Sequence, residues 1–222
     1  MGQYLKDVVF SANDGIITTF AVIAGTVGAD LPISVILIVG VASMIADGFS
    51  MATGNYLGTK SERELYYLEE KREFAEVKKL PEEELAEIRK ILTGKGYAGA
   101  ELDTMVKLIS SNEKYWVDFM MREELGLYLP SSRNPLLHAA ATFCSFILAG
   151  LLPLTPYIFI QNGDSFFLAA LFAGIALFTV GALRKFFSAR SWFFSGLEML
   201  LVGGSAATIA YLLGFVLRAA LQ

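Results

Sequence analysis

Residues 31–79 read LPISVILIVGVASMIADGFSMATGNYLGTKSERELYYLEEKREFAEVKK, and the character of the chain changes in the middle of this stretch. Residues 31–57 are apolar and long enough to cross about 30 Å of hydrocarbon as a helix. Residues 59–79 are highly charged, contain neither Gly nor Pro, and are rich in good helix formers. We therefore expect one helix that crosses a membrane and continues into water.

Four further apolar runs lie outside this stretch, at residues 8–29, 136–160, 166–187 and 192–217. Apolar residues make up 55% of the 222-residue chain and the mean hydropathy is +0.52, which is too apolar for a water-soluble domain of this size. The sequence predicts an all-α integral membrane protein with five transmembrane helices. Its expected parts are residues 1–57 with two spans, 58–133 as a soluble module, and 134–222 with three spans.

The basic residues around the spans predict the orientation of the chain. Lys6 precedes the first span, Arg184, Lys185 and Arg190 surround the link between the last two, and thirteen Lys and Arg residues lie in the module. All three regions face one side if the N-terminus is cytoplasmic, as the positive-inside rule favours. We expect no cleaved signal peptide, because the first run contains Asp14 and lacks a convincing cleavage site.

The module carries 16 of the 22 acidic residues. It is predicted to hold three helices: the end of the second span, a helix that starts at Pro81 and is ended by Gly94 and Gly96, and a helix over about 99–125. Its 16 acids balance 13 bases, which argues against nucleic-acid binding.

Several glutamates of the module have the spacing of metal ligands. Two pairs lie three residues apart, each pair on one helix face, and a turn near residue 80 could bring the faces together. The full candidate set of carboxylates and softer thioethers is Glu73, Glu76, Glu84, Glu87, Met120, Met121 and Glu124. Such a mixed set suits a divalent transition metal. On spacing alone the alternatives remain open, because glutamates also occur on solvated helices and methionines also fill cores.

Two aspartates interrupt the first two apolar runs. An ionised carboxylate there costs on the order of 3 kcal/mol, so Asp14 and Asp47 need a cavity, a partner or a proton. Met51 lies one turn from Asp47 and adds a sulfur ligand to the same helix face. The alternative is a hydrogen bond between helices, which fits Glu198 better. Gly15, next to Asp14, could let a substrate approach the main chain.

The sequence argues against catalysis. Cys144 is the only cysteine, and a di-iron oxidase would need Glu-x-x-His pairs, whereas the chain has only His138. We interpret His138 as a polar anchor at the membrane boundary. No enzyme activity and no organic cofactor are expected.

Two motifs resemble the vacuolar iron transporter family. They are ANDGIITTFAVIAG at residues 12–25 and ADGFSMATGNY at residues 46–56, and the resemblance extends over essentially the whole chain. It implies a dimeric antiporter that moves ferrous iron, and often manganese, out of the cytosol in exchange for protons. It also implies roles for Asp14 and Met51 in the pathway, for Asp7 near the cytoplasmic entrance, and for the seven ligands of the module. Asn55 departs from the family, since many members have a carboxylate there.

The expected function is thus proton-coupled export of Fe²⁺, with Mn²⁺, Zn²⁺ and Co²⁺ as further candidates, because a thioether disfavours Mg²⁺ and Ca²⁺. The expected partners are divalent metal ions, protons, the lipid bilayer and a second copy of the chain as a homodimer. The expected location is a microbial plasma membrane, with a vacuolar membrane as the other option. The alternative function is a membrane-anchored metal sensor or scaffold without transport.

Overall fold

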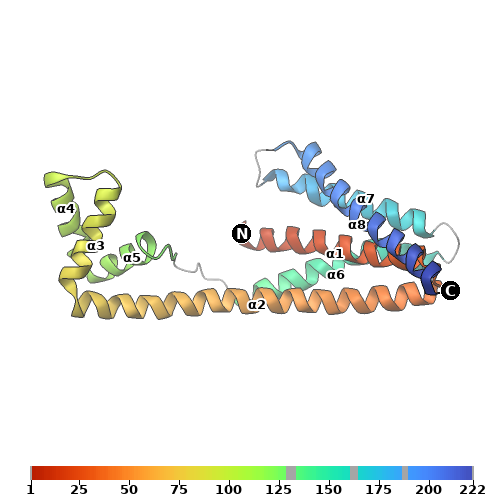
Figure 1. Ribbon diagram of the computed structural model, residues 1–222, viewed down its shortest axis with the longest axis horizontal. Coiled ribbons are helices and arrows are strands. Elements are labelled where there is room, and N and C mark those ends of the chain that lie inside the picture. The colour runs from red at the N-terminus through yellow and green to blue at the C-terminus, as the bar shows by residue number, and fades with distance from the viewer. Residues whose placement is uncertain (1, 129–133, 161–164, 187–189, 222) are drawn as a thin grey trace. The chain divides into compact units, whose positions relative to one another are not determined.

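A computed structural model describes residues 2–128, 134–160, 165–186 and 190–221, and their regular structure is entirely helical. The helices, labelled in Figure 1, are α1 (Gly2–Gly28), α2 (Ile33–Lys79), α3 (Pro81–Gly94), α4 (Gly99–Ser110), α5 (Glu113–Glu123), α6 (Pro135–Phe159), α7 (Ser165–Leu183), the short 3-10 helix η1 (Arg184–Phe186) and α8 (Trp192–Leu221). The chain forms two compact units. One contains Met1–Leu57 with Asn134–Gln222, and the other contains Gly58–Arg133.

Five of these helices are long and apolar enough to cross a membrane: α1, α2, α6, α7 and α8. The prediction of five spans in an all-α protein is therefore confirmed for the described residues. The fourth expected run ends differently, because its helix gives way to η1 at Arg184, and residue 187 lies outside the described part. The predicted continuation of the second span is also confirmed, since α2 runs without a break to Lys79.

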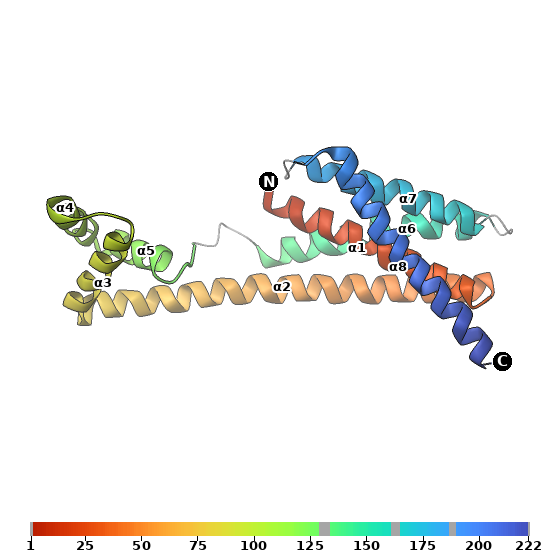
Figure 2. The same ribbon diagram turned by 45° about the horizontal axis from the view of Figure 1, so that its top comes forward.

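We call the first of these units, which contains the five long apolar segments, the membrane unit. It is built around α1, which packs against α6, α7 and α8, while α7 lies alongside α8 (Figures 1 and 2). Glycines allow the close approach that such contacts need in lipid. A Cβ on Gly28 would overlap the main chain of Tyr211, and one on Gly214 would overlap the main chain of Gly25. Main-chain packing between α1 and α8 thus depends on these two small residues.

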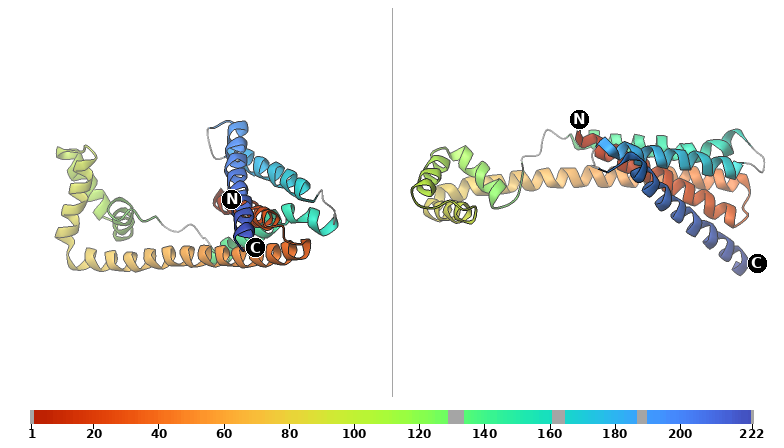
Figure 3. Two further views of the ribbon diagram at one scale, coloured as in Figure 1. Left: turned by 45° about the vertical axis from the view of Figure 1, so that its right-hand side comes forward. Right: turned by 90° about the horizontal axis from the view of Figure 1, so that it is seen from above.

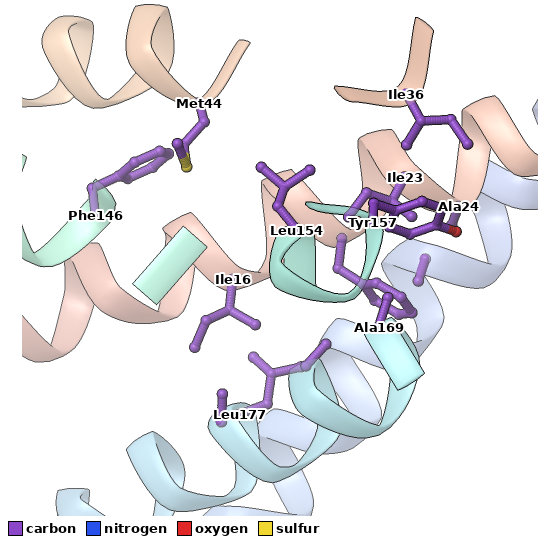
Figure 4. Close-up of a cluster of buried hydrophobic side chains, with 14 residues drawn as sticks. Ile16, Ile23, Ala24, Ile36, Met44, Phe146, Leu154, Tyr157, Ala169 and Leu177 are labelled. Atoms are coloured by element: carbon purple, nitrogen blue, oxygen red, sulfur yellow. The ribbon is translucent and has the colours of Figure 1, made fainter. Parts of the chain in front are cut away.

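The buried side chains of the membrane unit join α2 to the other spans. Figure 4 shows Met44 of α2 beside Phe146 of α6, with Ile16 of α1 and Leu177 of α7 in the same cluster. Phe146 and Ile16 are fully buried. Gly40 and Gly48 of α2 lie against the side chains of Leu154 and Phe146 of α6.

The second unit has its own core. The charged end of α2 and helices α3, α4 and α5 (Figure 3) enclose a cluster that includes the fully buried Ile88, Val117, Met120 and Met121. The expected helix boundaries are confirmed at one helix, because α3 starts at Pro81 and ends at Gly94. Burial of this apolar surface supplies the main stabilisation of the unit.

The prediction of three helices in this unit is wrong. The segment expected as one helix over 99–125 is two helices, α4 and α5, separated at Ser111 and Asn112. The backbone of Asn112 is extended, and its side chain accepts a hydrogen bond from the backbone N–H of Tyr115 at 3.1 Å. Asn112 is therefore an N-cap that starts a new helix, so the unit contains the end of α2 and three further helices.

Candidate metal sites

The carboxylates of the second unit converge where α2 turns into α3. Only Leu80 separates the two helices, so the last turns of α2 face the first turn of α3. Among the described residues, Glu73, Glu76 and Glu84 each offer a carboxylate oxygen, and these oxygens all lie within 4.8 Å of one another. The first predicted pair thus meets one member of the second pair, Glu84, across the turn.

Glu87 and Glu124 join this group. Besides burial, the charges of Glu87 and Glu124 both raise the pKa of Glu73 and of Glu84, and the charge of Glu87 also raises the pKa of Glu124. Glu124 is placed by the end of α5, where its backbone N–H donates to the carbonyl of Met120 at 3.0 Å. The structure therefore brings together all five predicted glutamates, from three helices, which we call the carboxylate cluster.

The electrostatics of the carboxylate cluster are unfavourable without a cation. Burial, followed by the charge of Glu84 and of the other cluster members, raises the pKa of Glu73 to about 7. Burial, followed by the charge of Glu87, likewise raises the pKa of Glu84 to about 7. Burial is also the largest cause of the raised pKa of Glu124. A dication bound among these groups would stabilise their charged forms.

Hydrogen bonding does not compensate this charge. Within the described residues, the buried Oε2 atoms of Glu73 and Glu84 have no hydrogen-bond partner. Arg72 forms an ion pair with Glu76 at 3.0 Å, but it does so from the exposed side of α2. Buried polar atoms are normally paired, so these two unpaired carboxylate oxygens have the capacity to accept a cation.

Met120 and Met121 have no exposed surface and belong to the apolar core of this unit. Both lie on α5, one turn before Glu124. Their burial fits a role in the core. Their position in the sequence, one turn before a glutamate of the carboxylate cluster, also fits a role as ligands. Their role as metal ligands stays a prediction.

The intramembrane carboxylates also approach one another. Asp14 is half-buried on α1, Asp47 is exposed on α2, and their charges are close enough to interact. Met51 is half-buried one turn further along α2 and packs against the core of the membrane unit. The structure thus places the two predicted carboxylates of the first two spans in one region.

Gly15 has a structural function that the sequence did not indicate. A Cβ on this residue would overlap the carbonyl oxygen of Phe146 and lie 3.1 Å from its carbonyl carbon. The main chain beside Asp14 is therefore covered by α6, so the expected approach of a substrate to Gly15 is wrong. Its lack of a side chain brings α1 and α6 together.

His138 is buried, so its interpretation as a polar anchor that faces the membrane surface is wrong. Its side chain is 3% exposed, its Nδ1 is paired with Asp7 Oδ2, and its ring stacks on Tyr4 with centroids 4.4 Å apart. One turn further along α6, Thr142 Oγ1 accepts a hydrogen bond of 2.7 Å from Asn55 Nδ2. Neither pair could be predicted from the sequence, because the partners lie on different helices.

Glu198 is held by exposed arginines. Its carboxylate lies 3.5 Å from Arg184 and 3.4 Å from Arg190, and its side chain is about half exposed. The pair with Arg184 connects α8 to η1, and the pair with Arg190 connects α8 to the residue two positions before its start. They agree with the structural role that the sequence favoured for this residue.

The fold and its polar residues define a class: a multi-pass membrane protein with carboxylates in its first two spans and a soluble helical unit that bears a carboxylate cluster. The family model described as VIT family matches residues 5–215. The chain belongs to this family, as its two motifs predicted.

The chain matches its relatives over nearly its own whole length and over three quarters or more of theirs. The chain is 35% identical over 211 residues to the vacuolar iron transporter of Centaurea cyanus, which covers 95% of this chain and 86% of that protein. It is 34% identical over 218 residues to vacuolar iron transporter 1 of Arabidopsis thaliana, covering 98% and 87%. It is 36% identical over 226 residues to the vacuolar iron transporter of Toxoplasma gondii, covering 97% and 75%. The proteins that it resembles are thus named as transporters.

Proposed function

We propose that this chain is an Fe²⁺ transporter that exports the ion from the cytoplasm in exchange for protons, with Mn²⁺, Zn²⁺ and Co²⁺ as further candidate cargo. The observation that carries the proposal is the carboxylate cluster. Three oxygens from Glu73, Glu76 and Glu84 meet within 4.8 Å, and two of these glutamates have buried oxygens without a partner in the described structure. The names of the relatives support iron as the ion.

The cluster serves as the collector of the ion. Five glutamates supply hard oxygen ligands, and a thioether from Met120 or Met121 would add preference for transition metals over Mg²⁺ and Ca²⁺. Binding displaces protons from Glu73 and Glu84, because both have a pKa near 7. The unit therefore concentrates divalent metal near the membrane surface.

The transport step belongs to Asp14, Asp47 and Met51. Asp47 is exposed on a helix that crosses the membrane, where contact with lipid would be costly. A second copy of the chain placed against α2 would remove this contact and add a second set of ligands. We therefore propose a homodimer whose metal pathway runs between the two copies, beside Asp14.

Proton coupling follows from the same carboxylates. A carboxylate that releases a cation into a proton-rich compartment can take up a proton. The transporter then returns to its other state with a neutral carboxyl group and no unpaired charge in the membrane. Asp14 and Asp47 are the groups that we assign to this exchange. Asp7 lies near the start of α1, where it would meet ions arriving from the cytoplasm.

We propose that the N-terminus and the carboxylate cluster are cytoplasmic, since the basic residues of the chain gather in these regions. The proposed location is the plasma membrane of a microbial cell, although the relatives are vacuolar by name. Membrane fractionation with antibodies to the N-terminus would test both statements.

A metal sensor or scaffold is the competing function. It shares the carboxylate cluster but needs no carboxylates in the spans. Uptake of Fe²⁺, Mn²⁺, Zn²⁺ and Co²⁺ by proteoliposomes, with and without a pH gradient, separates the two functions. The transporter predicts flux that increases with the gradient, whereas binding without flux would establish the sensor.

A further inference from the structure

His138 is a buried titratable group that has no role in the metal pathway proposed above. It is the only histidine of the chain, it lies in the first turn of α6, and its side chain is 3% exposed. One ring nitrogen, Nδ1, is paired with Asp7 Oδ2. The other, Nε2, is buried and has no hydrogen-bond partner among the described residues.

The pairing with Asp7 fixes the chemistry of the ring. An ionised carboxylate can only accept a hydrogen bond, so the proton lies on Nδ1 of His138. In neutral imidazole this leaves a lone pair on Nε2. Leaving such an acceptor buried and unpaired is unfavourable, so Nε2 calls for a further partner.

The arrangement is that of a metal-binding histidine. Histidine ligands in metal sites nearly always donate their second ring N–H to a carboxylate, a backbone carbonyl or water, which fixes the tautomer and increases the basicity of the ligating nitrogen. Asp7 supplies this carboxylate here. Tyr4 stacks on the ring and holds its plane, with centroids 4.4 Å apart.

Polar groups connect this position with the intramembrane carboxylates. On α1, Asp7, the fully buried Ser11 and Asp14 follow at spacings of one helical turn and therefore share a face. On α6, His138 is followed one turn later by Thr142, which is 2% exposed and accepts a hydrogen bond from α2. The polar face of α6 ends at the next turn with the fully buried Phe146, beside Gly15.

We propose that Nε2 of His138 is a ligand for the transported divalent cation, in a site at the entrance of the membrane unit that Asp7 supports. The inference rests on the proposed transport function, to which it adds the first ion position inside the spans. Imidazole nitrogen binds Fe²⁺, Co²⁺ and Zn²⁺ well and Mg²⁺ and Ca²⁺ poorly. The site therefore also acts as a selectivity filter after the carboxylate cluster.

A spectroscopic test follows from the presence of a single histidine. Full-length protein labelled with ¹⁵N-histidine gives one pair of ring nitrogen signals, which report on His138 alone. We expect addition of Zn²⁺ to shift the Nε2 signal while Nδ1 keeps its proton, whereas Mg²⁺ leaves both signals unchanged. An Nε2 signal that does not respond to saturating Zn²⁺ overturns the proposal.

Two substitutions of His138 distinguish a role as metal ligand from a role that is limited to positioning Asp7. In H138N the amide nitrogen lies near the former Nδ1 and can still donate to Asp7, but no group replaces Nε2. If His138 is a ligand, H138N raises the half-saturating Zn²⁺ concentration for uptake by about tenfold or more, the scale of losses at metal sites. H138Q, which carries a polar atom near the Nε2 position, should recover part of this loss.

The same measurements show whether a failure concerns the histidine ligand or the transport function. Normal half-saturation in H138N, together with flux in the unsubstituted protein, overturns the histidine ligand and leaves the transporter intact. An Nε2 shift with Zn²⁺ in a protein that shows no flux supports the ligand and overturns the transporter.

Discussion

Gly15 of α1 lies directly against the main chain of Phe146 of α6, so close that residue 15 has no room for a Cβ beside the Phe146 carbonyl oxygen. This contact lies next to Asp14, the carboxylate that we assign to the transport step. The close approach of two helices at this point fixes the depth and direction of α1 relative to α6. The position of Asp14 therefore depends on the absence of a side chain at its neighbour.

G15A should destabilise the membrane unit. A methyl group at this position meets main-chain atoms, which cannot rotate away, and overpacking of this kind costs about 1–3 kcal/mol. We expect a lower midpoint in thermal unfolding of the detergent-solubilised protein. G204A is the matched control, since a Cβ on Gly204 would meet no atom within 4 Å. Equal midpoints for the two variants would contradict the close contact.

Neutralising the carboxylate cluster should stabilise the metal-free unit and abolish its metal binding. E73Q and E84Q remove like charges from a buried group, so hydrogen exchange in α3 and α5 should become slower without metal. The same variants should show weaker Fe²⁺ or Mn²⁺ binding in calorimetric titration. E82Q is the control, because Glu82 is exposed in the same turn of α3. Undiminished binding in the double variant E73Q/E84Q would remove the collector role.

Metal binding by the carboxylate cluster should increase with pH. Glu73 and Glu84 have pKa values near 7, against an ordinary value of 4.5, so the folded protein holds their protons more tightly than the unfolded chain does. The contribution of these two groups to the stability of the metal-free unit is therefore fully present below about pH 4.5 and is lost as the pH rises through about 7. Metal competes with these protons, and both groups are already about half protonated at pH 7, so affinity should fall about fivefold per displaced proton between pH 7 and pH 6. Calorimetry in buffers of different ionisation enthalpy measures both affinity and proton release, and an affinity that does not change over this interval would refute the assignment.

Replacement of the methionines tests their role as ligands. M120L and M121L keep nearly the same volume in the core, so each should cost less than about 1.5 kcal/mol of stability. If a thioether binds the metal, the variants lose affinity for Fe²⁺ and Co²⁺ more than for the harder Mn²⁺. The ratio of the dissociation constants for Co²⁺ and Mn²⁺ measures this preference. A ratio identical to that of the unsubstituted protein would assign both methionines to the core alone.

The features that the sequence predicted correctly are local ones. The five spans follow from apolar runs, the length of α2 follows from the absence of Gly and Pro after Thr59, and the bounds of α3 follow from Pro81 and Gly94. The convergence of Glu73, Glu76 and Glu84 was predictable because one residue, Leu80, connects their helices. The break at Asn112 was missed, although an Asn before Glu and Tyr is a recognisable start of a helix.

The features that the sequence did not predict are contacts between distant segments. His138 and Asp7 are 131 positions apart, and Asn55 and Thr142 are 87 apart. No periodicity within one helix indicates which residue of another helix will face it. The burial of His138 depends on the packing of α1 against α6, which in turn depends on Gly15 and Phe146.

The most direct test of the central claim is Fe²⁺ flux through D14N in proteoliposomes with an imposed pH gradient. Asn keeps the size and polarity of Asp14 but can neither hold a charge nor take up a proton. We predict that D14N abolishes gradient-driven Fe²⁺ transport while its carboxylate cluster binds the metal as before. Full Fe²⁺ flux through D14N would contradict the assignment of the transport step to this carboxylate.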